Sequence, residues 1–221
     1  MNRFVRSLRP ATAILAALIV AATAAGCSAA GGTPLTTPGP TAAATTASTC
    51  PTSQPDPLPA GTNRIVTIET SKGTIQITVS ANLAPIAAGN FVALASCGFY
   101  NGVVFHRLVP DFVIQGGDPK GTGTGGPGYT IADEPVTARY QRGTVAMARS
   151  SAPNSQGSQF FIVLADGAGT VLSQANTYAI FGSVTLGMET VDAIAAMPNS
   201  GPPNNTALQP VAMTKVTVTA P

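Results

Sequence analysis

The sequence predicts a mainly β protein in which eight antiparallel strands form a closed barrel capped by two α-helices. Three observations support this fold class. Eight short segments rich in Val, Ile, Thr and Phe follow one another at modest spacing, as strands of an all-β domain do. Two further segments have the apolar spacing of amphipathic helices. A sheet of this many antiparallel strands tends to close on itself, because closure removes its exposed edges.

The first two predicted strands form a hairpin. Residues 65–69 and 74–79 are rich in Ile, Val and Thr, and the turn between them ends in glycine. Within the second strand apolar residues alternate with polar ones, which is the pattern of a strand with one buried face. The other strands are predicted at 103–109, 112–115, 144–149, 159–164, 178–184 and 211–219.

The two predicted helices are expected at the two ends of the barrel. In 84–96 apolar residues recur at helical spacing, Pro85 suits the first turn, and Gly98 follows the last turn. In 188–197 apolar residues fall on one side with the same period. The barrel is expected to contain packed side chains, because eight strands enclose only a narrow interior.

The N-terminus has the features of an export signal. Three arginines precede the apolar run 11–25, which is shorter than the roughly 20 residues that span a bilayer. The run ends in Ala24-Ala25-Gly26-Cys27, which resembles a bacterial lipobox, although Ala24 stands where Leu is usual. Residues 1–27 are therefore predicted to be a signal peptide with lipidation at Cys27, which anchors the protein on the extracytoplasmic side of the cell membrane. Plain secretion is the alternative.

Residues 28–62 are predicted to be a disordered tether in front of a domain at 63–221. They consist mostly of Thr, Pro, Ala and Gly with one charge, so they offer little that could build a core. Cys50 in this segment and Cys97 in the domain remain as a pair. Export permits a disulfide between them, and the sequence leaves the bond open.

Charge and composition argue against several kinds of function. Without the three arginines of the signal, 8 basic residues stand against 9 acidic ones, so nucleic acid is not an expected partner. A Ser-His-Asp hydrolase would have to use the single histidine, His106, but the sequence has no Gly-x-Ser-x-Gly motif for the nucleophile. The Cys and His residues show no metal-binding spacing. Paired carboxylates that could serve acid–base catalysis are scarce, since Asp133 and Glu134 are adjacent in the sequence. The Gly-rich stretch 116–128 is predicted to be a flexible surface loop. No cofactor is predicted.

One reaction needs neither nucleophile nor metal, namely rotation about an X–Pro peptide bond, whose barrier of about 20 kcal/mol is amide resonance. A cation aimed at the proline nitrogen stabilises the twisted amide more than the planar one. Arg107 could supply that cation, Gln115 could hold the peptide carbonyl, and Phe112 could form a wall of the proline pocket. Strand alternation would turn His106 away from Phe105 and Arg107.

Three motifs in one order resemble the cyclophilin-type peptidyl-prolyl isomerases. They are FHRLVPDFVIQGGD (105–118), GTVAMARSSAPNSQGSQFFI (143–162) and YAIFGSV (178–184). The resemblance spans nearly all of the domain and implies its barrel fold and activity. By position, Arg107, Gln115 and Phe112 match the catalytic residues. The positions that match the substrate-binding residues are Val113, Met147, Ala148, Arg149, Gln159, Phe161, Leu172 and Tyr178.

The chain departs from the family pattern at several positions. Val113 stands where many members have Met, Arg149 where Asn is common, and Tyr178 where His is often found. The chain has no Trp, so cyclosporin is expected to bind weakly. The predicted function is isomerisation of proline-containing segments of exported proteins by a monomer that assists their folding. The alternatives are a non-catalytic proline-peptide binding or chaperone module and a secreted hydrolase that uses His106.

Overall fold

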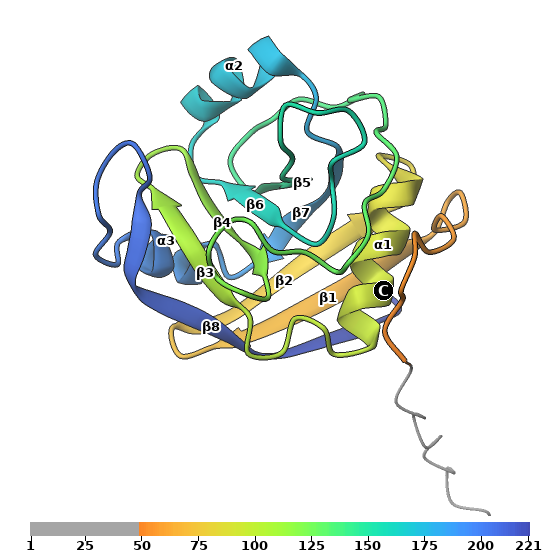
Figure 1. Cartoon of the computed structure of the whole chain (residues 1–221), viewed down its shortest axis with the longest axis horizontal. Helices are drawn as coiled ribbons and strands as arrows, with labels where there is room; N and C mark the ends of the chain where they lie inside the picture. Colours follow the sequence, from red (N-terminus) through yellow and green to blue (C-terminus); the bar gives the residue numbers. More distant parts are fainter. Residues whose placement is uncertain (1–48) are drawn as a thin grey trace, which may run out of the picture. The chain divides into compact units, whose positions relative to one another are not determined.

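The computed structural model describes residues 49–221, and all structural statements below concern this part of the chain. Its strands close into an antiparallel barrel in the order β1-β2-β7-β5-β6-β4-β3-β8 (Figure 1), which confirms the predicted barrel. The strands are β1 (Asn63–Thr70), β2 (Gly73–Ser80), β3 (Val104–Val109), β4 (Val113–Asp118), β5 (Thr144–Met147), β6 (Phe160–Val163), β7 (Ile180–Leu186) and β8 (Thr206–Thr219). Within residues 49–221 there is no helix with the length and apolar character needed to cross a membrane.

The described chain has three helices, one more than predicted. The two predicted helices, α1 (Pro85–Ser96) and α3 (Met188–Ala195), lie at opposite ends of the barrel (Figure 1). The third, α2 (Asp166–Ala175), contains two glycines and buries few apolar side chains, so its sequence carries little helical signal. It is stabilised by packing instead, because Gly169 lets the helix backbone lie directly against the carbonyl of Tyr140.

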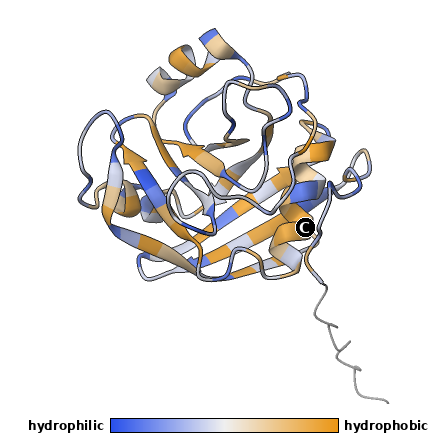
Figure 2. Cartoon of the chain, in the orientation of Figure 1, coloured by the Kyte–Doolittle hydropathy of each residue, from blue (hydrophilic) through white to orange (hydrophobic). Residues whose placement is uncertain are grey.

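The barrel interior is filled by tightly packed side chains. Ile75, Ile77 and Val79 in β2 point inward and are fully buried. The ring of Phe91 in α1 closes one end and lies 5.2 Å from the ring of Phe160 and 4.8 Å from that of Phe181. Figure 2 shows hydrophobic and more hydrophilic residues in turn along β1 and β2, as expected for strands with one face on the core.

A second apolar cluster lies on the outer side of four strands. Along β4, Ile114 belongs to the interior core, whereas its neighbour Val113 belongs to the outer cluster, and Phe160 and Phe161 in β6 divide in the same way. Side chains of α2 and the ring of Tyr140 cover this outer cluster. Strands β4, β5, β6 and β7 are therefore apolar on both faces. The outer cluster consists of Val113, Tyr140, Ala146, Phe161, Val163, Ala168, Leu172 and Ile180.

A β-bulge in β3 decides which side of the barrel Arg107 faces. Phe105 is paired with Gly116 and Arg107 with Gln115, so His106 has no partner in β4. Phe105 is fully buried in the core. With strict alternation Arg107 would also point inward, but the extra residue turns it to the outer face. The strict alternation predicted around His106 is wrong for this reason.

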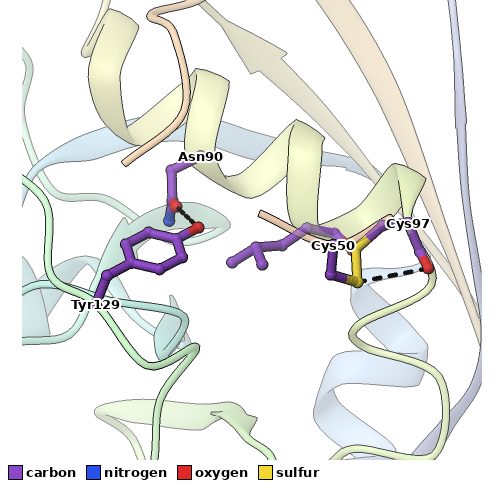
Figure 3. Close-up of a disulfide and its surroundings, with 5 residues drawn as sticks. Cys50, Asn90, Cys97 and Tyr129 are labelled. Carbon is purple, nitrogen blue, oxygen red and sulfur yellow. Dashed lines mark hydrogen bonds between the residues drawn. A yellow bond between two sulfur atoms is a disulfide. The ribbon is translucent and has the colours of Figure 1, made fainter. Parts of the chain in front are cut away.

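The composition of 28–62 predicts a disordered tether, and for the described residues 49–62 this prediction is wrong. Cys50 and Cys97 form a disulfide at the end of α1 (Figure 3). Leu58 is 8% exposed and belongs to the core, and its N–H donates to the first residue of α1 at 2.9 Å. We call residues 50–62 the N-terminal strap, because they lie along the helix.

Candidate active site

Three predicted site residues lie in one row across neighbouring strands. Arg107 in β3 is paired with Gln115 in β4, and Gln115 is paired with Phe161 in β6. Directly paired residues of antiparallel strands place their side chains on the same face of a sheet. A cation, an amide and an aromatic ring therefore share the outer face of the barrel.

Hydrogen bonds fix the polar part of this row. Arg107 Nη1 donates to Gln115 Oε1 at 3.4 Å, and Gln115 Nε2 donates to Gln159 Oε1 at 2.9 Å. Gln159 Nε2 in turn donates to the carbonyls of Gly123 and Gly125 at 3.0 and 2.9 Å. Each amide thus has a set orientation. A guanidinium group has five N–H donors and Gln Nε2 has two, so both Arg107 and Gln115 keep donors that a peptide could meet.

The apolar part of the predicted site is formed by the outer cluster. Val113, Phe161 and Leu172 form its floor and are 2%, 4% and 5% exposed. Phe112 and Tyr178 pack against the cluster and are half-buried, so their rings keep accessible surface. The rings of Phe161 and Tyr178 meet edge to face with centroids 5.4 Å apart. Arg107 and Gln115 therefore border a surface that suits an apolar ring.

Met147 does not join this cluster. Its side chain is fully buried in the barrel core, because alternation along β5 turns Ala146 outward and Met147 inward. It can support the site only from inside the barrel, and the prediction that it lines the substrate site is not matched by its position. Cys27, the predicted lipidation site, lies outside the described residues.

Ala148, Arg149 and Gln159 lie together on the side of Gln115 that faces away from Arg107. They line a groove of about 740 Å³ whose other wall is the Gly-rich segment 123–130. The backbone N–H of Ala148 donates to the carbonyl of Gln159 at 2.9 Å, which continues the β5–β6 pairing to the rim of the groove. This groove can accommodate a segment of a bound peptide that flanks its proline.

The Gly-rich loop is organised by a buried carboxylate, and the prediction of a flexible loop is wrong. Asp118 is 1% exposed and accepts backbone N–H bonds of 2.6 to 3.1 Å from Lys120, Thr122, Gly123 and Gly125. Burial acts to raise the pKa of Asp118, but these bonds outweigh it, and the pKa is lowered. The ionised carboxylate thus holds the carbonyls that orient Gln159.

Replacing Asp118 by asparagine is expected to destabilise the protein by about 3 kcal/mol at neutral pH, because a buried anion that accepts several N–H bonds is lost. The folded-state pKa lies below the ordinary value. The contribution of Asp118 is therefore fully present above the pKa of the unfolded state and is lost as the pH falls toward the folded-state pKa. Urea unfolding of both proteins at pH 7 and pH 3 should show a smaller difference at pH 3. An equal difference at both pH values would contradict this account.

His106 lines a separate cavity of about 400 Å³ together with Arg107, Gln115 and Thr122. Burial, the largest cause, lowers the pKa of His106, so the imidazole is neutral at pH 7. Among the described residues neither ring nitrogen has a hydrogen-bond partner. A catalytic triad would require a carboxylate bonded to the imidazole, and the described chain places none there.

No cluster of three or more His, Cys, Asp or Glu side chains suited to a metal ion occurs within residues 49–221.

Tyr140 and Asn90 were not predicted to support the site. Tyr140 donates its hydroxyl to the carbonyl of Tyr178 at 2.8 Å. Asn90 accepts from the hydroxyl of Tyr129 at 2.8 Å (Figure 3) and donates to the carbonyl of Gly157 at 2.7 Å. Both act through tertiary contacts that no local sequence pattern reveals.

The fold and the row of site residues define the class of protein: a closed β-barrel whose candidate site lies on its outer face. Residues 65–218 match the family model for cyclophilin type peptidyl-prolyl cis-trans isomerase/CLD. The chain belongs to this family of isomerases. A peptidyl-prolyl cis-trans isomerase of Acinetobacter baylyi is 41% identical over 163 residues, which cover 71% of this chain and 86% of the relative.

Further comparisons give relatives of the same isomerase family. A probable peptidyl-prolyl cis-trans isomerase A of Mycobacterium leprae is 38% identical over 175 residues, which cover 71% of this chain and 92% of the relative. The crystal structure of a cyclophilin type isomerase of Cryptosporidium parvum superposes with a TM-score of 0.64 at 31% identity and covers 72% of this chain and 99% of that chain. A structure of the same Cryptosporidium protein in the presence of the dipeptide Ala-Pro gives a TM-score of 0.63.

Proposed function

We propose that this cyclophilin-family chain isomerises X–Pro bonds in exported proteins, and that Arg107 stabilises the twisted amide. The observation that carries the proposal is the row of Arg107, Gln115 and Phe161 on the outer face of the barrel. It places a guanidinium beside an apolar surface on which a proline ring can lie. The Cryptosporidium relative has been crystallised in the presence of Ala-Pro, which supports a proline-containing ligand.

The chemistry follows from the electronic structure of the amide. In the planar state the nitrogen lone pair is delocalised into the carbonyl and accepts hydrogen bonds poorly. At the twisted state resonance is lost and the lone pair returns to nitrogen. An N–H of Arg107 aimed at that nitrogen is then a stronger partner than in the ground state, which lowers the barrier. The second N–H of Gln115 Nε2 can hold the peptide carbonyl while the bond rotates.

The extracytoplasmic setting rests on two features of the N-terminal region. The first is the basic start, apolar run and lipobox-like Cys27, which fit a cleaved and lipidated signal. The second is the disulfide between Cys50 and Cys97, which fits an oxidising compartment. The proposed location is the outer side of the cell membrane, with two or more acyl chains giving a stable anchor. Intact mass of the exported protein tests cleavage and acylation, and an unmodified Cys27 would contradict the anchor.

The activity is tested by a chymotrypsin-coupled assay on an Xaa-Pro peptide with the full chain. The protein is expected to accelerate the slow phase, which without a catalyst takes tens to hundreds of seconds at 25 °C. A titration of the same peptide followed by NMR measures binding separately. Binding without acceleration would replace the proposed enzyme by a proline-peptide binding module, and neither binding nor acceleration would reject both.

His106→Ala is expected to leave turnover nearly unchanged. The neutral imidazole makes no hydrogen bond within the described residues, and the proposed chemistry needs no general base. The coupled assay on wild type and His106→Ala checks this, with a thermal melt of each protein to establish folding. A folded variant without activity would favour a mechanism that depends on the histidine.

A further inference from the structure

The adjacent carboxylates Asp133 and Glu134 perform two different tasks. Glu134 accepts the backbone N–H groups of Ile86 and Ala87, both at 2.8 Å. Ala84, the N-cap residue of α1, provides no side-chain bond. Glu134 therefore satisfies two of the free N–H groups in the first turn and places a negative charge at the positive end of the helix. It fixes this segment to α1.

Asp133 points to the loop between β5 and β6. Its Oδ2 accepts the N–H of Asn154 at 2.8 Å and lies 3.0 Å from Arg149 Nη1. Its Oδ1 accepts a bond from Gln156 Nε2 at 2.9 Å, and its own N–H donates to Asn154 Oδ1 at 2.9 Å. One carboxylate thus contacts three positions of the loop that forms a wall of the groove.

Arg149 extends these contacts to the other side of the site. The guanidinium is held in place, since the side chain is only 10% exposed. It donates to the carbonyl of Ala152 at 2.7 Å and to that of Thr177 at 3.4 Å. Thr177 precedes Tyr178, whose ring packs on Phe161. The Asp133–Arg149 pair therefore joins the groove wall to the segment that carries an aromatic wall of the apolar surface.

We propose that Asp133 is a positioning residue for peptide binding, which sets the groove wall formed by Arg149, Ser150 and Ser155. Asp133 itself does not line the groove, so it acts through these residues. The ligand is the peptide segment that flanks the X–Pro bond, and the inference rests on the proposed isomerase function.

Apart from the contacts of Asp133 and Arg149, residues 150–155 are held mainly by hydrogen bonds of Ser150 and Ser155 within the loop itself. Residues 150–154 are exposed, so no apolar side chain there anchors the wall in the core. Binding to a wall with several conformations costs the free energy of ordering it, which lowers the apparent affinity. The rotation step takes place at Arg107, which does not line the groove. Loss of Asp133 should therefore weaken binding and leave kcat unchanged.

The charge on Asp133 strengthens these contacts. Burial acts to raise the pKa of Asp133, but bonds from Asn154, Gln156 and Arg149 outweigh it and lower the pKa. The carboxylate is therefore ionised at neutral pH, and hydrogen bonds to an ionised acceptor are stronger than those to a neutral one. An asparagine at this position keeps the size and loses the charge.

The test compares wild type with Asp133→Asn in the full chain. The Kd of an Xaa-Pro peptide, measured by NMR titration, is expected to rise on the order of tenfold, the scale of one charge-assisted hydrogen bond. The kcat of isomerisation should stay within about twofold, because the transition-state contacts of Arg107 are retained. Asn154→Gly is a second, milder variant. Its φ of 52° is open to glycine without strain, and the variant removes the side-chain acceptor of the Asp133 N–H.

The matched control is Asp192→Asn. Asp192 forms an ion pair with Arg142 at 2.6 Å, and neither residue lines the groove. This variant should bind the peptide as wild type does. In a double-mutant cycle, Asp133→Asn and Arg149→Ala should be less than additive, because both remove the same ion pair, and the remaining effect of Asp133→Asn should reflect its bonds to Asn154 and Gln156.

An unchanged Kd in folded Asp133→Asn and Asn154→Gly would overturn the inference. A fall in kcat at constant Kd would also overturn it, because Asp133 would then act on the chemical step. Additive effects with Arg149→Ala would show that the two residues do not act together. These outcomes differ from failure of the proposed function, in which wild type itself would not isomerise the peptide.

Discussion

Replacement of Arg107 by alanine is expected to lower kcat/KM for isomerisation of an Xaa-Pro peptide by about 10²- to 10³-fold. This is the loss found when one preorganised donor to a transition-state charge is removed, about 2.7–4 kcal/mol. The side chain is half-buried on the outer face and makes one hydrogen bond to Gln115 within the described residues. Its removal should therefore affect turnover far more than stability, and the coupled assay together with a thermal melt measures both.

Two variants make the Arg107 result specific. Arg107→Lys keeps the charge and loses the planar donor fork, so its kcat/KM should lie between those of wild type and Arg107→Ala. Arg139→Ala removes the same charge from an exposed position, where salt screens the charge, and should match wild type. Equal rates for wild type and Arg107→Ala would reject the mechanism. A loss in Arg139→Ala would point to net charge as the cause.

The bulge that directs Arg107 could not be predicted from the sequence. Phe105 and Arg107 are two residues apart, so regular alternation puts both on one face. The structure places Phe105 in the core and Arg107 outside, with His106 as the extra residue between them. The resemblance to the family motifs predicted that Arg107 is catalytic, but it did not predict on which face of the barrel the side chain lies. A bulge depends on pairing with β4, which the sequence of β3 alone does not contain.

Alternation worked well where strands are regular. In β4, β5 and β6 it separates interior from outer residues, and it explains why Phe161 lies in the outer cluster and Met147 in the core. The residues that stabilise the site from outside these strands are harder to predict. Asp118 and Asp133 act through backbone N–H groups and side chains of loops, and loop geometry has no sequence period. Helix α2 was not predicted because its segment contains two glycines and buries few apolar side chains.

Composition misled the prediction at the N-terminal strap. Thr, Pro and Ala are typical of a tether, but Leu58 enters the core and Gln54 Oε1 accepts the N–H of Ala132 at 2.9 Å. Gly89 leaves room for this packing, because a side chain there would collide with the backbone of Asp56 and Leu58. A disulfide to a residue 47 positions away holds the segment in place, and local composition has no information about such a partner.

The second large effect is expected from removal of that disulfide. The variant Cys50→Ser/Cys97→Ser should unfold at a Tm lower by about 5–15 °C. For the sequence separation of 47 residues, the chain-entropy account gives about 4 kcal/mol, and measured values are typically about 2–4 kcal/mol. For a chain of this size each kcal/mol shifts Tm by about 2–4 °C.

Unfolding of the double variant should begin in the strap, because the disulfide holds that segment. The N–H of Leu58, which donates to Pro85 O, should exchange with solvent faster in the double variant, while amides of the barrel strands should change less. Turnover at 25 °C should persist, since no strap residue lines the groove or belongs to the outer cluster. Reduction of wild type by dithiothreitol should reproduce the variant's Tm and should leave the variant itself unchanged. If reduced wild type, with its thiols shown to be free, melted at the same temperature as the oxidised protein, packing of Leu58 and the α1 contacts would be sufficient to hold the strap, and the disulfide would contribute nothing measurable.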